Sequence, residues 1–246
     1  MLMNTEQRAV ELGEFFGMDP EPVYARLAKG FWENHALVAE DFNEAKTDVD
    51  DPDSLLHWYR TTEAYIWELT TYHLEEGFNY TGMCDGIVSH AKNAGKTSFL
   101  SLGDGIGDLV IRAAEEGMAA TYHDLEGSRT AEFAQFRFNR RDDLTINTLF
   151  TDNFQPVLGS RKFDVIAALD FLEHVPNVEV WAEAIYKALK KGGLFIPQNA
   201  FACGDAENGN SIPMHLSVNN HWVEDWDPMM LDLGFTTTGN GWWSKP

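Results

Sequence analysis

The chain has 246 residues, of which 44% are apolar, and its 39 Asp and Glu residues against 18 Lys and Arg residues give a net charge of −21. This composition supports a large core, and the negative surface repels nucleic acid and anionic membranes, so neither is expected as a partner. No run of 18 apolar residues is present, so no membrane-spanning helix is expected, and the polar sequence MLMNTEQRAVELGEFF is not expected to act as a signal peptide.

Helices dominate the predicted structure of residues 1–80, which we assign to an N-terminal appendage. Helical segments are expected at residues 5–17, 20–30 and 54–77 and, just beyond, at 83–94. Residues 36–53 are acidic and poor in apolar side chains, which is typical of a linker. Ser54 is positioned to cap the long third segment, because apolar residues recur at helical spacing from Leu55 to Leu69.

Strands and helices alternate from residue 98 onward. Strands are expected at residues 99–102, 119–124, 145–152, 163–170 and 193–199, with a final strand or hairpin at 235–245. Helices are expected at residues 107–117, 128–141, 176–193 and 227–234. Alternation of this kind produces a mostly parallel sheet covered by helices on both faces, so residues 81–246 are predicted to form one doubly wound α/β domain.

Local features mark the ends of several of these helices. Ser128 is expected to cap one helix, and the pair Asp227 and Pro228 to open the last one. Basic residues cluster in one place, at Arg129, Arg137, Arg140 and Arg141. The last three fall at an expected helix C-terminus, where the helix dipole favours cations, so we attribute them to helix capping.

The loop LGDGIGD follows the first expected strand, where doubly wound sheets bind their ligands. Its glycines are Gly103, Gly105 and Gly107. A dinucleotide fingerprint needs GxGxxG, but residue 108 is Asp. A phosphate-binding P-loop needs GxxxxGK[ST], but the GKT at 95–97 lacks the first glycine and precedes the strand. The spacing that remains is GxGxG.

Residues 98–198 resemble the class I S-adenosylmethionine-dependent methyltransferases, which have a seven-stranded sheet and a loop of this kind. Adenosylmethionine carries no phosphate, and glycines let the backbone approach its adenosine and methionine parts closely. The acidic loop residues Asp104 and Asp108 suit a sulfonium cation and an α-amino group and would repel pyrophosphate. The resemblance therefore implies S-adenosyl-L-methionine as the cofactor.

Other motifs of the same family follow in order. FDVIAALDFLEHVP resembles the fourth family motif, and LKKGGLFI resembles the segment that leads into the fifth strand. The resemblance implies that Asp124 binds the ribose hydroxyls of the cofactor and that Asp152, with Asn153, binds the adenine amino group. Alternatively, the carboxylate of Asp124 stabilises a helix start and that of Asp152 stabilises a turn. The cofactor-binding residues so implied are Ser101, Gly103, Asp104, Gly105, Gly107, Asp124, Leu125, Asp152, Asn153 and Leu169.

Two positions depart from the family pattern. Ser101 stands where the family usually has an acidic residue that engages the methionine part of the cofactor. Either Asp104 or Asp108 substitutes for it, or the affinity for the cofactor is weaker. The chain also reaches WWSKP where many relatives continue through two full terminal strands, so a hairpin at 235–245 would have to complete the sheet.

Catalysis is expected at the end of the fourth strand, where Asp170, Glu173 and His174 form a D-x-x-E-H sequence. This sequence resembles the E-x-x-E-H of metal-assisted O-methyltransferases, in which His215 or His221 would add a further ligand. Many relatives carry E-H-V-P without a metal, and we expect no metal here. In that case His174 or His215 is the candidate base, with Asp170 beside it.

The N-terminal helices are predicted to form a lid that selects the acceptor. They offer an aromatic wall of Tyr59, Tyr65, Trp67, Tyr72 and Tyr80, of which at most one or two are expected to face the pocket, because aromatic residues at helical spacing usually belong to the core. The predicted acceptor is a small molecule methylated on a hydroxyl, with N- or C-methylation as the alternative.

Two other function classes stay open. A non-catalytic adenosylmethionine-binding module would keep the same carboxylates, whereas a nicotinamide oxidoreductase is disfavoured by Asp108. Cys84 and Cys203 lack CxxC spacing, so neither a disulfide framework nor a cysteine zinc site is expected, and a cytoplasmic location is favoured.

Overall fold

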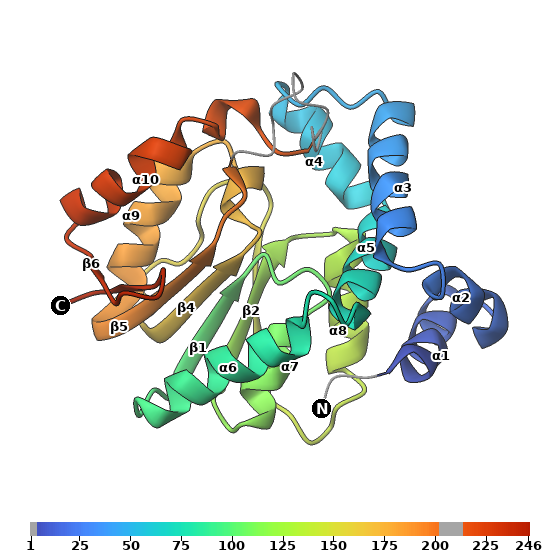
Figure 1. Ribbon diagram of the computed structural model, residues 1–246, viewed down its shortest axis with the longest axis horizontal. Helices are drawn as coiled ribbons and strands as arrows, with labels where there is room; N and C mark the ends of the chain where they lie inside the picture. Colours follow the sequence, from blue (N-terminus) through green and yellow to red (C-terminus); the bar gives the residue numbers. More distant parts are fainter. Residues whose placement is uncertain (1–3, 202–213) are drawn as a thin grey trace.

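The computed structural model describes residues 4–201 and 214–246, and Cys203 and the Gly/Asn-rich stretch around it lie outside the described residues. Its centre is a seven-stranded sheet in the order β3-β2-β1-β4-β5-β7-β6 (Figure 1). The strands are β1 Ser98–Leu102, β2 Ala119–Leu125, β3 Ile146–Thr151, β4 Phe163–Leu169, β5 Leu189–Gln198, β6 Thr236–Thr237 and β7 Trp243–Ser244. The first five are mutually parallel, and β7 is antiparallel to β5 and to β6.

The strand order confirms the predicted doubly wound α/β fold. From β1 the chain adds β2 and β3 on one side and then β4 and β5 on the other. The strand order therefore reverses between β1 and β4, and their carboxyl ends form the topological switch point at which such sheets bind ligands. The expected hairpin completes the sheet with only two residues in each of its strands.

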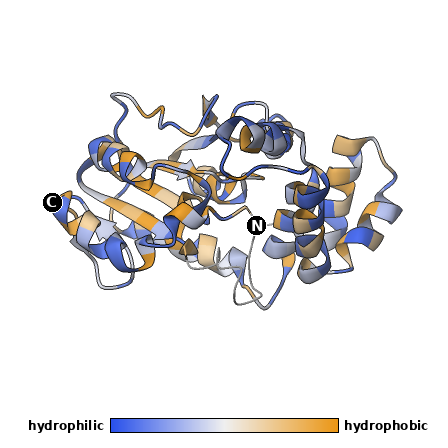
Figure 2. Ribbon diagram, turned by 90° about the horizontal axis from the view of Figure 1, so that it is seen from above, coloured by the Kyte–Doolittle hydropathy of each residue, from blue (hydrophilic) through white to orange (hydrophobic). Residues whose placement is uncertain are grey.

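Helices cover both faces of the sheet. They are α6 Tyr80–Asn93, α7 Asp108–Glu115, α8 Arg129–Phe138, α9 Val178–Ala188 and α10 Trp222–Asp232. One core cluster joins Trp181 of α9 to Phe195 of β5, and the other joins Val88 of α6 to Phe99 of β1. The strands are largely apolar, whereas the helices carry apolar and polar residues on different faces (Figure 2). In the described part of the chain, no helix is long and apolar enough to cross a membrane.

Five helices precede the sheet domain; the last three lie at the carboxyl ends of the strands, and the first two lie beside α8 (Figure 1). They are α1 Thr5–Phe16, α2 Pro20–Leu27, α3 Phe31–Glu44, α4 Pro52–Thr61 and α5 Ala64–Leu74. The linker predicted at 36–53 is right only for residues 45–51, because residues 36–44 belong to α3 and residues 52–53 begin α4. Phe31, Val38 and Phe42 bury one face of α3, so a few well-spaced apolar residues outweigh the acidic composition.

The single long helix predicted from Ser54 is also wrong, because α4 and α5 separate at Thr62. The hydroxyl of Thr62 donates a hydrogen bond to Asp41 Oδ2 at 2.7 Å and accepts one from the Ala64 amide at 3.1 Å. These bonds hold Thr62 in an extended conformation and start a new helix. Asp51, not Ser54, caps α4 by accepting a hydrogen bond from the Asp53 amide.

Smaller differences concern the later helices. Ser128 caps α8 as predicted, by accepting a hydrogen bond from the Ala131 amide. The helix predicted to reach residue 193 ends at Ala188, because Leu189 already pairs with Phe163 of β4. Pro228 lies inside α10 instead of opening it.

The arginine cluster does not cap a helix as we expected. Arg137 is buried, and its guanidinium binds Asp108 at 2.6 Å in the first turn of α7. Arg8 of α1 binds the same carboxylate at 2.9 and 3.1 Å and binds Glu11 at 2.6 Å. This buried ion cluster of Arg8, Glu11, Asp108 and Arg137 holds α1 against the sheet domain. Arg129, Arg140 and Arg141 form ion pairs with acidic residues instead, among them Glu63, Glu14 and Glu115 respectively.

Candidate functional site

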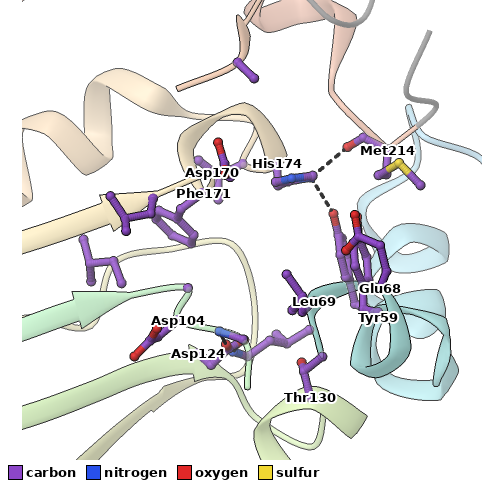
Figure 3. Close-up of a pocket in the computed structure, with 18 of the residues that line it drawn as sticks. Tyr59, Glu68, Leu69, Asp104, Asp124, Thr130, Asp170, Phe171, His174 and Met214 are labelled. Carbon is purple, nitrogen blue, oxygen red and sulfur yellow. Dashed lines mark hydrogen bonds between the residues drawn. The ribbon is translucent and has the colours of Figure 1, made fainter. Parts of the chain in front are cut away.

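A cavity of about 380 Å³ lies at the switch point, between the carboxyl ends of the strands and helices α3 and α5. Most of the predicted site residues line it: Ser101, Gly103, Asp104, Gly105, Asp124, Leu125, Asn153, Leu169, Asp170, His174 and His215. The predicted residues Gly107 and Asp152 do not line it. Figure 3 shows residues of the sheet domain on one side of this cavity and Tyr59, Glu68 and Leu69 on the other.

The glycine loop approaches both sides of the cavity closely. Gly103 and Gly105 have φ values of 59° and 54°, in the left-handed region that favours glycine. A Cβ on Gly103 would collide with the Phe171 ring, and one on Gly105 would lie 2.5 Å from Leu69 Cδ1. A Cβ on Gly107 would instead meet Phe138 of α8, so this third glycine serves helix packing.

Asp124 connects the glycine loop to the end of β2. Its carboxylate accepts hydrogen bonds from the Gly105 amide at 3.0 Å, the Leu125 amide at 2.7 Å and the Tyr122 hydroxyl at 3.0 Å. Burial raises the pKa of this carboxyl to about 6, against these three donors. An acidic group that costs stability when ionised and still faces a cavity is typical of a ligand-binding residue.

Ser101 is buried and lines the cavity. Asp104 and Asp108, the two candidates for the acidic contact that Ser101 cannot make, differ in position. Asp104 lines the cavity, but its carboxylate caps α7 through the amides of Leu109 at 3.4 Å and Val110 at 2.8 Å. Asp108 is fully buried in the ion cluster with Arg8 and Arg137 and does not line the cavity.

The segment after β3 turns its side chains in two directions. Thr151, the last residue of β3, and Asn153 line the cavity, whereas Asp152 is exposed, and within the described chain only its carbonyl oxygen accepts a hydrogen bond, from Arg60 of α4 at 2.5 Å. The adenine contact implied for Asp152 therefore remains a prediction that Asn153 is better placed to fulfil.

The D-x-x-E-H sequence forms a tight turn after β4. Asp170 has a φ of 48°, and its amide donates a hydrogen bond to the Gln198 carbonyl of β5 at 2.8 Å. Burial and the nearby Glu68 raise the pKa of Asp170 to about 6. Glu173 is fully buried: one oxygen accepts the Ala200 amide at 2.8 Å, and the other has no partner in the described chain.

His174 has its tautomer set by its neighbours. Its Nδ1 lies 3.1 Å from the Met214 carbonyl oxygen and 3.0 Å from the Tyr59 hydroxyl (Figure 3). A carbonyl only accepts, so Nδ1 carries the hydrogen and Nε2 keeps its lone pair. Burial, with the neighbouring His215, lowers the pKa of His174 to about 3, so the imidazole is neutral.

His215 lies beside His174 with the same arrangement. Its Nδ1 is 3.2 Å from the Ala200 carbonyl, and the two imidazole rings are perpendicular with centroids 4.6 Å apart. The alternative candidate His221 is exposed and bonds the Val218 carbonyl outside the cavity. The structure thus selects His215 as the second histidine of the site.

Three of these side chains are close enough to hold one metal ion. Ligand atoms of Glu173, His174 and His215 all lie within 4.8 Å of one another. Asp170, the fourth residue of the metal alternative, is outside this group among the described residues. Two imidazoles and one carboxylate suit several divalent transition metals, so the residues permit a metal without requiring one.

The buried carboxyl of Glu173 makes the stability of the protein depend on pH. Burial and Asp170 raise its pKa to about 8, so between about pH 4.5 and 8 the folded protein holds a proton that the unfolded chain releases. Its contribution to the unfolding free energy should fall as pH rises through this interval, by up to about 1.4 kcal/mol per pH unit.

Urea unfolding of Glu173→Gln from pH 5 to 8, with EDTA present, measures this contribution. We expect the variant to have a less negative slope of stability against pH than the natural protein, with the exposed Glu179→Gln as a control that keeps the original slope. Equal slopes of unfolding free energy against pH in all three proteins would contradict the buried, protonated state of Glu173.

The N-terminal helices contribute more to the cavity than the sequence indicated. Four tyrosines line it, namely Tyr59, Tyr65, Tyr72 and Tyr80, so the expectation of one or two was too low. Trp67 instead stacks on Phe16 at 5.2 Å in the helical core. His35 and Glu68, paired at 3.1 Å, also line the cavity. Sequence reasoning missed His35, because it predicted no helix over residues 31–44.

Comparison with known proteins identifies the central part of the chain. Residues 100–195 match the family model described as a methyltransferase domain. No curated protein matches the chain. An O-methyltransferase family protein from Burkholderia thailandensis is 14% identical, over 96% of this chain and 86% of that one, with a TM-score of 0.55. PigF, solved with SAH, is 17% identical over 80% of this chain and 60% of that one, with a TM-score of 0.51.

A further solved structure is an S-adenosylmethionine-dependent methyltransferase from Clostridium acetobutylicum. It is 20% identical over 58% of this chain, with a TM-score of 0.49, and this chain spans 61% of its length. At such low identities, the structures with the higher TM-scores establish a shared fold, and the family match shows that residues 100–195 are similar to a methyltransferase domain.

Proposed function

Since residues 100–195 match a methyltransferase domain, we propose that this chain is a class I S-adenosylmethionine-dependent methyltransferase and that it transfers a methyl group from S-adenosyl-L-methionine to a small molecule, at a hydroxyl group. The observation that carries the proposal is the meeting, in one cavity, of the glycine loop, Asp124 and the neutral imidazole of His174. The glycine loop and Asp124 suit an adenosyl ligand, and the imidazole of His174 suits an acceptor that must lose a proton.

The described residues that line the cavity fit the cofactor. They include the acidic side chains of Glu68, Asp124 and Asp170 but no lysine or arginine, so the cavity favours a sulfonium cation over a pyrophosphate. The backbone at Gly103 and Gly105 approaches closely, and Asp124 offers acceptors for ribose hydroxyls at the end of β2. Ser101, Leu125, Asn153 and Leu169 complete the proposed contacts.

His174 and Tyr59 form the acceptor side. The bound cofactor supplies an electrophilic methyl group, and the protein must orient the acceptor and receive its proton. Nε2 of His174 carries the free lone pair, and the Met214 carbonyl fixes the ring through Nδ1. His215 and Asp170 adjoin this position. The proposal uses no metal, although Glu173 and both histidines form a group that permits one.

The remaining features of the proposal concern partners and organisation. The net charge of −21 disfavours nucleic acid and anionic membranes as partners, and we propose a cytoplasmic enzyme. The helices within residues 1–80 act as the lid that selects the acceptor, and residues 81–246 carry the methyltransferase domain. The four tyrosines of the cavity favour a flat or aliphatic acceptor. N- or C-methylation is the alternative chemistry.

A non-catalytic adenosylmethionine-binding subunit is the other candidate function. It is favoured by the depressed pKa of His174, which makes the imidazole a weak base. Such a subunit would bind the cofactor and co-purify with a partner without forming product.

Calorimetric titration with S-adenosylmethionine, S-adenosylhomocysteine and NADH tests the proposal. We expect binding of both adenosyl ligands and none of NADH, followed by methylated product in a screen of hydroxyl and amine acceptors with and without Mg²⁺. Binding of NADH alone would reject the cofactor, and binding of the adenosyl ligands without any product would favour the binding subunit.

A further inference from the structure

His73 of α5 connects the buried ion cluster to the cavity. Its Nδ1 lies 2.6 Å from Asp108 Oδ2, and its side chain is 5% exposed and lines the cavity. The Tyr80 ring stacks on the imidazole with centroids 3.6 Å apart, which fixes the plane of the ring. Asp108 itself has no access to the cavity, so His73 stands between this carboxylate and any ligand.

The ion cluster determines which nitrogen of His73 carries the hydrogen. Although burial by itself raises the pKa of Asp108, Arg137, Arg8 and His73 hold it well below its usual value, so this carboxylate only accepts hydrogen bonds. Nδ1 is therefore the donor. Burial, supported by the two arginines, lowers the pKa of His73 and outweighs Asp108, which raises it, so the ring is neutral and Nε2 carries a lone pair.

Nε2 of His73 is free to bind a ligand. No hydrogen bond reaches it from the described chain, and it is not among the fully enclosed polar atoms that lack a partner. The atom thus opens to the cavity, beside the loop that carries Asp104. A lone pair held in this position accepts a hydrogen bond from a donor such as an ammonium group.

Within the described glycine loop, no free acid takes the place of the one absent at position 101. Ser101 replaces the usual acid, and the oxygens of Asp104 are directed at the amides of Leu109 and Val110. We propose that His73, oriented by Asp108, binds the α-ammonium group of the cofactor in place of the acid absent at position 101. This inference rests on the proposed function and adds to it a binding residue supplied by the N-terminal helices.

The variant His73→Asn isolates this role. An asparagine amide can reproduce the Nδ1–H donor toward Asp108, which preserves the ion cluster, but it has no atom at the position of Nε2. Calorimetry at pH 7 should compare three ligands: S-adenosylhomocysteine, decarboxylated S-adenosylmethionine, and methylthioadenosine, which lacks the amino-acid part. His90→Asn, on the exposed side of α6, is the matched control.

We expect the Kd of the first two ligands to rise about tenfold or more in His73→Asn, as for the loss of one hydrogen bond to a charged group, with methylthioadenosine unchanged. An equal loss of affinity for all three ligands would show a structural effect and overturn the proposal. Unchanged affinity for all three would also overturn it. A loss for S-adenosylhomocysteine alone would assign His73 to the carboxylate and also overturn it. If the natural protein binds none of the three, the proposed function itself fails.

Discussion

Asp124→Ala is expected to weaken binding of S-adenosylmethionine about 100-fold. In the proposed complex, the carboxylate accepts hydrogen bonds from two ribose hydroxyls, and bonds to a charged group contribute about 1.5–3 kcal/mol each. Losing both, with some replacement by water, costs about 3 kcal/mol, which is a factor of about 100 in Kd. Calorimetric titration of the natural protein and the variant measures this ratio.

The same substitution should change the stability of the ligand-free protein little, because the loss of three hydrogen bonds and the removal of a buried charge oppose each other. The pKa of Asp124 is raised to about 6 by burial, so its ionised form at pH 7.5 costs folding free energy instead of contributing it. Thermal unfolding separates this result from a misfolded variant. Asp124→Asn, which keeps an oxygen for the Gly105 amide, should show a smaller loss of affinity.

Asp142→Ala is the control, because Asp142 is exposed and does not line the cavity. We expect its affinity for the cofactor to match that of the natural protein. Equal affinities for Asp124→Ala and Asp142→Ala would show that Asp124 only supports the glycine loop, and the proposed ribose contact would be abandoned.

His174→Gln is expected to lower kcat about 100-fold while the Kd of the cofactor changes less than twofold. A positioned proton acceptor contributes about 10²–10⁴ to a rate. We expect an effect at the lower end of this range, because a pKa of about 3 makes the His174 imidazole a weak base. Single-turnover methylation of an acceptor found in the screen measures the effect.

The pH dependence offers a second measure of the same residue. With its pKa near 3, His174 stays neutral across the working range, so it should cause no loss of kcat between pH 5 and 7. His57→Gln, an exposed histidine outside the cavity, controls for the substitution. An unchanged kcat in His174→Gln would reduce this residue to a packing role and move the search for the base to His215.

The sheet domain could be predicted from sequence because its pattern is local and repeated. Each strand is a short apolar run, and each following helix begins at a recognisable residue such as Ser128. The N-terminal helices were predicted less well, since α3 is acidic and buries only a narrow stripe that includes Val38 and Phe42. The break at Thr62 depends on Asp41, which is distant in sequence and invisible to any local pattern.

The sequence by itself determined the order of the elements from β1 onward, the glycine loop, and the placement of Asp124 and His174 at strand ends. These follow from periodicity and from the topology of parallel sheets, whose carboxyl ends meet at one edge. Only the tertiary structure decided that His215 and not His221 joins the site, that Asp108 is enclosed by Arg8 and Arg137, and that His73 faces the cavity. These outcomes depend on packing between segments far apart in the chain, which sets burial, hydrogen-bond partners and protonation together.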